Sequence, residues 1–170
     1  HAVYLAQHHG ISAGLCLAIP LYEQWDLLKN NHKAVLVGLT AGVVTSLVTV
    51  LVLSLLLGLS HEEYVTMLPK SITTAIGMGV SEELGGYVTI TVAVIIVTGV
   101  LGNMFGELIC KVFKIEEPIS KGLAFGSAAH AIGTAKAMEI GEIEGAMSSL
   151  AIAVSGILTV ILSSVFAHFL

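Results

Sequence analysis

The sequence contains no arginine, and all seven of its basic residues are lysines. Proteins that bind nucleic acid present a face rich in Arg and Lys, so nucleic acid is excluded as a partner. Cysteine is scarce too, and Cys16 and Cys110 lack the paired spacing of a disulfide or a metal site. The chain also has no catalytic triad, P-loop or GxGxxG segment. We therefore expect no enzyme and no bound cofactor.

Charge is also scarce, since charged residues make up 11% of the chain against roughly 25% in soluble domains. Hydrophobic residues make up 55%, and the mean hydropathy is +0.93. Apolar runs at 34–59, 87–108 and 146–170 are each long enough for a helix that crosses a bilayer. These features predict a multi-pass membrane protein with one transmembrane domain over 1–170. The chain begins with His1 and shows no signal peptide, so we expect further spans to precede it.

The sequence contains a weak internal repeat, in which segment 71–86 aligns with segment 127–142. The aligned identities are Ser71/Ser127, Ala75/Ala131, Ile76/Ile132, Gly77/Gly133, Glu83/Glu139 and Gly85/Gly141. Each copy is rich in small residues and is followed by an apolar run, a layout that segment 10–20 repeats more loosely. Pro69 lacks a backbone donor and the glycines loosen a helix. We expect these segments to be broken or re-entrant helices.

Lysines gather before the first apolar run and after the second one, at positions 29 and 33 and at positions 111, 114 and 121. Loops rich in lysine favour the cytoplasm, so both groups are cytoplasmic if segment 69–86 makes no net crossing. The halves at about 60–110 and 111–170 then start from opposite sides of the membrane, as in the inverted repeats of secondary transporters. The expected fold is an all-α, transporter-like bundle with an inverted repeat and discontinuous helices.

The short segments carry polar side chains that a bilayer interior disfavours, which makes them candidates for a binding site. In a continuous helix, Ser127, His130 and Thr134 share one face. Lysines and the free N–H groups of half-helix N-termini favour an anionic group, while hydroxyls and imidazole suit its other oxygens. We therefore predict a site for a small carboxylate. Its predicted residues are Lys70, Ser71, Thr73, Thr74, Ser127, His130, Gly133, Thr134 and Lys136.

Several of these residues also have a purely structural interpretation. Ser and Thr hydroxyls often hydrogen-bond between membrane helices, and Lys70 fits a snorkelling interfacial lysine equally well. The glutamates that follow the short segments would couple H⁺ or Na⁺ to a solute, or mark solvated ends. We favour solvated ends, with Glu139 as the i,i+3 partner of Lys136. Ser60 and Glu63 fit the capping box of a short interfacial helix.

Three segments carry a recognisable family pattern: "LAIPLYEQWDLLKNN" (17–31), "LPKSITTAIGMGVSEELGG" (68–86) and "KGLAFGSAAHAIGTAKAMEIGEIEGAMSSLAIAVSGILT" (121–159). They resemble the LrgB/CidB family of bacterial membrane proteins. The resemblance implies a multi-pass protein of the bacterial cytoplasmic (inner) membrane that acts with a small LrgA/CidA-like partner. Bacterial members are described as antiholin-like or holin-like regulators of murein hydrolase activity and cell lysis. Related plastid proteins are similar to translocators of glycolate and glycerate, and bacterial members are linked to pyruvate.

Two functions follow from these observations. The polar segments favour a transporter of small monocarboxylates such as pyruvate, glycolate or glycerate, which works by alternating access around a midplane site. The alternative is an antiholin-like regulator of murein hydrolase activity and cell lysis that has no solute site of its own. The small-xxx-small segment 38–42 predicts one close helix contact, either within the chain or in a homodimer.

Overall fold

The computed structural model describes residue 22 and residues 24–170, which form helices and the turns between them. Within these residues, three helices are long and apolar enough to cross a membrane, with candidate spans Lys29–Leu57, Val88–Val112 and Glu142–Phe169. The helices are α3 (Trp25–Leu57), α6 (Val88–Val112) and α8 (Glu142–Phe166), and the 3-10 turn η1 (Ala167–Phe169) follows α8. The prediction of an all-helical membrane protein is confirmed. Cys16 and the short segment at 10–20 lie outside the described residues.

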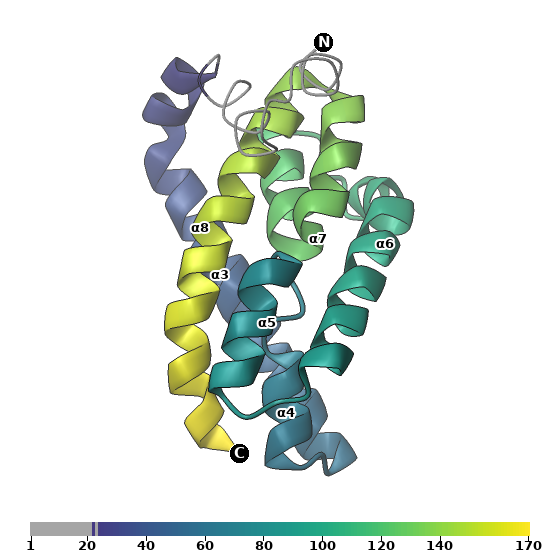
Figure 1. Ribbon diagram of the computed structural model, residues 1–170. Coiled ribbons are helices and arrows are strands. Elements are labelled where there is room, and N and C mark those ends of the chain that lie inside the picture. Colours follow the sequence, from purple (N-terminus) through teal and green to yellow (C-terminus); the bar gives the residue numbers. More distant parts are fainter. Residues whose placement is uncertain (1–21, 23) are drawn as a thin grey trace, which may run out of the picture.

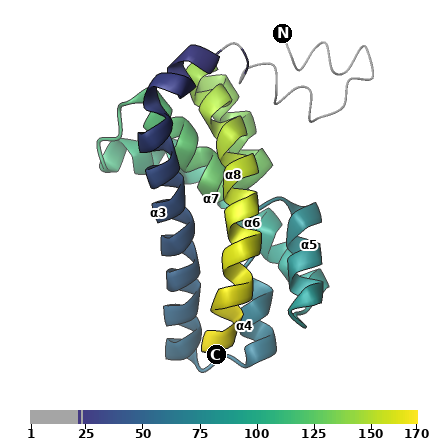
Figure 2. The same ribbon diagram turned by 90° about the vertical axis from the view of Figure 1, so that its left-hand side faces the viewer.

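Two short helices, α4 (His61–Met67) and α5 (Thr74–Glu83), lie between α3 and α6 in the chain. The predicted capping box starts α4, because Ser60 Oγ accepts from the Glu63 N–H at 3.3 Å and Glu63 Oε2 accepts from the Ser60 N–H at 2.8 Å. The buried Tyr64 hydroxyl donates to the Phe166 carbonyl at 2.9 Å. The Tyr64 hydrogen bond holds α4 beside the end of α8, and α4 and α5 share the lower half of the molecule (Figures 1 and 2).

Helix α7 (Pro118–Ile140) is interrupted at His130, whose backbone has φ 44° and ψ −138°. Along a straight helix, Phe125 and Ala137 would lie about 18 Å apart. Instead both belong to one buried cluster with Cys110, against which Ile140 also packs. The two stretches of α7 therefore lie side by side and form a hairpin in the upper half of the molecule (Figure 1).

Glycines on α6 allow the α7 hairpin to approach closely. A Cβ at Gly99 would lie 2.6 Å from the ring of His130, and a Cβ at Gly102 would overlap that of Ala129. A Cβ at Gly106 would overlap the ring of Phe125. Because any side chain at these positions would push the helices apart, the glycines fix the distance between α6 and the first half of α7.

Helices α3 and α8 run in the same direction, as Figure 2 shows. Near the start of α3, Val35 and Leu39 pack with Ala151 of α8. Near its end, Leu47 and Val50 belong to a cluster that includes Ala167. Helix α6 runs in the opposite direction to α3, so the start of α3 and the turn after α6 lie at the same end of the molecule (Figures 1 and 2). The two groups of lysines, at 29 and 33 and at 111, 114 and 121, lie at this end too.

Candidate functional site

A cleft of about 720 Å³ lies between α3 and the first half of α7. The two helices run alongside each other there, with Gly38 opposite Leu123 and Gly42 opposite Ser127. A Cβ at Gly42 would lie 3.7 Å from Ser127 Oγ, an ordinary contact distance, so the close helix contact expected at 38–42 stays a prediction. We call this space the α3–α7 cleft.

One end of the α3–α7 cleft is polar and carries a positive charge. Lys70 Nζ donates to Ser71 Oγ at 2.8 Å, and Ser71 Oγ lies 3.4 Å from Ser46 Oγ of α3. Ser127 also lines the cleft, and its hydroxyl donates to the Leu123 carbonyl at 2.7 Å. An ammonium has three donor hydrogens, so Lys70 has two left for a ligand. Thr45 and Thr49 of α3 complete this polar end.

Lys70 has no acidic partner in the part of the chain that the structure describes. Its side chain is half-buried, and desolvation lowers the pKa of its ammonium. Glu117 lines the same cleft, but it caps α7 by accepting from the Ser120 N–H at 2.6 Å. Ile119, two residues after Glu117, packs against the cluster that contains Val35, and Val35 lies about 16 Å along α3 from Ser46. A partly buried charge without a partner is costly, and an anionic ligand would compensate it.

His130 and Thr134 are buried outside the α3–α7 cleft. His130 Nε2 lies 2.9 Å from the Ile95 carbonyl of α6, so Nε2 carries the proton and donates it. Thr134 Oγ1 donates to the His130 carbonyl at 2.9 Å and lies 2.7 Å from Ser148 Oγ. The expectation that Ser127, His130 and Thr134 share one helical face was wrong, because the backbone leaves helical geometry at His130.

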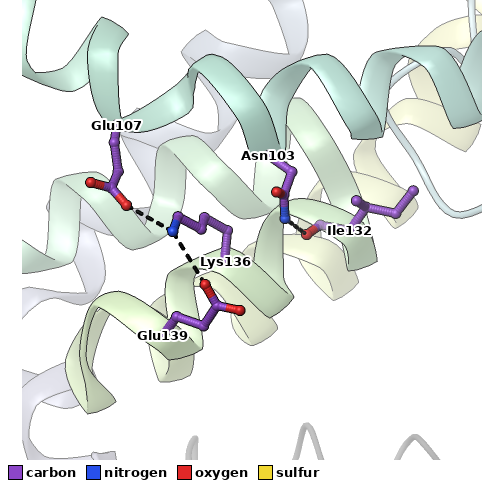
Figure 3. Close-up of polar contacts among 5 residues, drawn as sticks. All are labelled: Asn103, Glu107, Ile132, Lys136 and Glu139. Carbon is purple, nitrogen blue, oxygen red and sulfur yellow. Dashed lines mark hydrogen bonds and ion pairs between the residues drawn. The ribbon is translucent and has the colours of Figure 1, made fainter.

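Lys136 is not part of the cleft lining, and Figure 3 shows its side chain pointing toward Glu107 of α6. Its ammonium lies 3.0 Å from Glu107 Oε1 and 3.2 Å from Glu139 Oε2. The predicted i,i+3 pair with Glu139 is confirmed, and the sequence did not indicate Glu107. Nearby, Asn103 Nδ2 donates to the Ile132 carbonyl at 3.0 Å, just past the interruption of α7. These contacts attach the second half of α7 to α6.

The other predicted residues also lie apart from the cleft lining. Thr73 is the N-cap of α5 and Thr74 its first residue, and both are half-buried. Gly133 follows the interruption of α7, where a Cβ would lie 2.6 Å from Ala129 Cβ. The structure thus brings together Lys70, Ser71 and Ser127, and roles for the remaining residues stay predictions.

The sequence reasoning missed the contribution of α3 to the α3–α7 cleft. Thr45, Ser46 and Thr49 all line its polar end. Their signal was present, because these three hydroxyl residues are spaced one, three and four apart within a long apolar run. Their partner segment, however, is the turn at 69–71, and no spacing in the sequence indicates that pairing.

Comparisons with known proteins agree on one family. The sequence profile of the LrgB-like family matches residues 11–169. Curated relatives named "Antiholin-like protein LrgB" come from Bacillus mycoides (strain KBAB4), Bacillus cereus (strain B4264) and Bacillus anthracis (strain CDC 684 / NRRL 3495). Each is 39% identical over 158 residues, which cover 93% of this chain and 69% of the relative. No solved structure matches the chain.

Proposed function

The chain belongs to the LrgB-like family, and from this premise we propose that it is an antiholin-like protein of the bacterial cytoplasmic membrane. In this function it restrains murein hydrolase activity and cell lysis together with a small LrgA/CidA-like membrane protein. The observation that carries the proposal is the family match over residues 11–169, shared with relatives that bear this name. The sequence alone favours transport, whereas the names of the relatives favour the antiholin-like function.

The outer surfaces of the long helices are compatible with this function. Large apolar side chains are exposed along α3 and α6, among them Leu56 at 77% and Val97 at 55%. Apolar side chains of this kind face lipid tails or the apolar helices of a membrane partner. The proposal therefore places both the bilayer and the partner protein against these helices.

The test is a lysis assay in a bacterial strain that lacks its own LrgB-like protein. Complementation with the full-length protein should lower murein hydrolase activity and slow autolysis, and an empty vector should not. Equal autolysis in both strains would contradict the proposal. Lys70→Gln belongs in the same assay, because a regulator without a solute site would tolerate this change.

A second candidate function is transport of a small monocarboxylate, and a specific observation favours it. The α3–α7 cleft has an ammonium that lacks an acidic partner among the described residues, beside the hydroxyls of Ser46 and Ser71. A carboxylate would accept from the ammonium and from these hydroxyls. The cleft volume of about 720 Å³ exceeds what one small carboxylate needs, so water would fill the remainder.

The arrangement of the helices supports an inverted repeat as part of this second candidate. The short helix α5 leads into α6, and the hairpin α7 leads into α8. Helices α6 and α8 run in opposite directions, and the pair α4 and α5 lies in the lower half of the molecule while the α7 hairpin lies in the upper half (Figure 1). Alternating access by rocking of such halves would expose the cleft to each side in turn. Coupling to H⁺ or Na⁺ belongs to this proposal as well.

Transport is tested by uptake of labelled pyruvate, glycolate and glycerate into proteoliposomes that hold the full-length protein, with and without its partner. A transporter gives saturable uptake that Lys70→Gln abolishes. If uptake is absent under imposed H⁺ and Na⁺ gradients while the lysis assay succeeds, only the regulator remains.

A further inference from the structure

A second, smaller pocket of about 200 Å³ lies where α6 ends, between its last turn, the turn that follows and both halves of α7. Lys111, Lys114 and Lys121 line it, together with Glu107 and Glu116. This pocket is separate from the α3–α7 cleft and has no role in the functions proposed above. We call it the lysine pocket.

The lysine pocket has an excess of positive charge. None of its lysines forms an ion pair within residues 24–170, whereas Glu107 pairs with Lys136 at 3.0 Å (Figure 3). Lys136 also pairs with Glu139 at 3.2 Å, so Glu107 is not fully neutralised, and the pocket lining holds three lysines against the two carboxylates of Glu107 and Glu116. The pocket is therefore suited to a small, strongly anionic group.

Lys114 occupies a backbone position that favours glycine. Its φ is 54°, and the turn closes with the Ile115 N–H donating to the Cys110 carbonyl at 2.8 Å and the Lys114 N–H to the Lys111 carbonyl at 3.2 Å. Helices that end with this hydrogen-bond pattern usually carry glycine at the residue with positive φ. The chain has lysine there despite the strain, which points to a use for its side chain.

The surroundings of the lysine pocket identify the source of the anion. It lies at one end of α6, a candidate membrane span, and thus near the level of lipid headgroups. The last residues of this span expose apolar side chains, with Val112 at 68% and Phe113 just beyond it at 73%. We propose that the lysine pocket binds the phosphate of an anionic phospholipid, whose acyl chains lie against this apolar surface of α6.

The test is native mass spectrometry of the full-length protein with phosphatidylglycerol or phosphatidylcholine. The wild type should retain phosphatidylglycerol in preference, and Lys114→Gln and Lys121→Gln should each lower the retained amount about fivefold. Lys33→Gln is the matched control, because Lys33 lies at the same end of the molecule but outside the pocket. Equal retention in all variants, or of both lipids, would overturn the proposal.

Lys114→Gly separates lipid binding from folding. Glycine relieves the backbone strain, so this variant should unfold at the wild-type temperature or above while losing phosphatidylglycerol like Lys114→Gln. In phosphatidylcholine nanodiscs, inorganic phosphate should not raise the unfolding temperature. If it does so as strongly as phosphatidylglycerol, free phosphate is the ligand and the lipid proposal fails.

Discussion

Lys70 combines partial burial, one neutral hydrogen-bond partner and a place in a cleft that is open to a ligand. Each of these features alone is common, because a snorkelling lysine is also partly buried. What separates Lys70 from Lys136 is the partner, since Lys136 has Glu107 and Glu139. Of these two lysines, Lys70 is the one at which a ligand would supply a missing negative charge.

The pKa of Lys70 leads to a pH prediction. Desolvation lowers this pKa, and only the protonated amine attracts an anion. Binding of a carboxylate to the wild type should therefore weaken as the pH rises toward the ordinary lysine value of about 10.4, before an exposed lysine would lose its proton. Lys70→Arg should keep its affinity over the same range, because a guanidinium stays charged. Calorimetric titrations across this pH range measure both; identical pH profiles would contradict the prediction.

The backbone of His130 gives a second prediction at this scale. Both His130→Gly and His130→Ala lose the hydrogen bond to Ile95, but only glycine accepts φ 44° without strain. Strain at such a position costs the alanine variant about 1–3 kcal/mol of stability. Glycine avoids this strain, but the greater freedom of its unfolded chain lowers stability by about 0.4–1 kcal/mol. We expect the glycine variant to be the more stable by about 1 kcal/mol in thermal unfolding. An alanine variant of equal or greater stability would mean that residue 130 lies in a regular helix.

Among the elements, the contact between α6 and α7 depends on small residues. Gly102→Ala places a methyl group on Ala129, so it should destabilise the protein by about 1–3 kcal/mol. Gly79→Ala in α5 is the matched control, because its Cβ meets no atom within 4 Å. That change should stabilise by about 0.5–1 kcal/mol through helix propensity. Thermal unfolding of the two variants should shift in opposite directions, and a shift of the same sign would contradict this packing.

The elements differ in how well their sequence predicts them. Hydropathy alone locates α3, α6 and α8, because a span needs a long apolar run. Local hydrogen bonds locate the start of α4 and the Lys136–Glu139 pair, because both partners lie three residues apart. For α7, the sequence predicts a broken or re-entrant helix but not the place of the interruption. Its position at His130, a non-glycine residue with positive φ, depends on tertiary contacts that the local sequence does not encode.

Dependence on tertiary contacts also explains why only part of the candidate site could be predicted from the sequence. Lys70 and Ser71 are neighbours in the chain, so their place in one binding site could be predicted from the sequence. Ser46 and Ser127 come from two other elements, and only the packing of α3 beside α7 brings them to the same cleft. His130 and Thr134 were grouped with Ser127 through a helical period that the kink interrupts. Contacts between elements far apart in the sequence therefore determine which of the predicted residues lie in the same cleft.

At the scale of the whole molecule, the structure predicts how the chain sits in the bilayer. Both lysine-rich ends should face the cytoplasm, and α4 should lie on the other side. In a background with Cys16 and Cys110 replaced by Ser, an impermeant maleimide should label Lys33→Cys and Lys114→Cys only in inverted vesicles. It should label Glu62→Cys of α4 in intact cells. Labelling of Lys33→Cys and Lys114→Cys from opposite sides would contradict the arrangement of α3 and α6.

The most direct test of the α3–α7 cleft is equilibrium binding of labelled pyruvate to the full-length protein in nanodiscs, which measures the site without a transport or lysis assay. We compare the wild type with Lys70→Gln and with Lys136→Gln, which removes a lysine outside the cleft. Saturable binding that Lys70→Gln abolishes and Lys136→Gln retains is the predicted result. Absence of saturable binding to the wild type, or equal binding to Lys70→Gln, would contradict an anion site in this cleft.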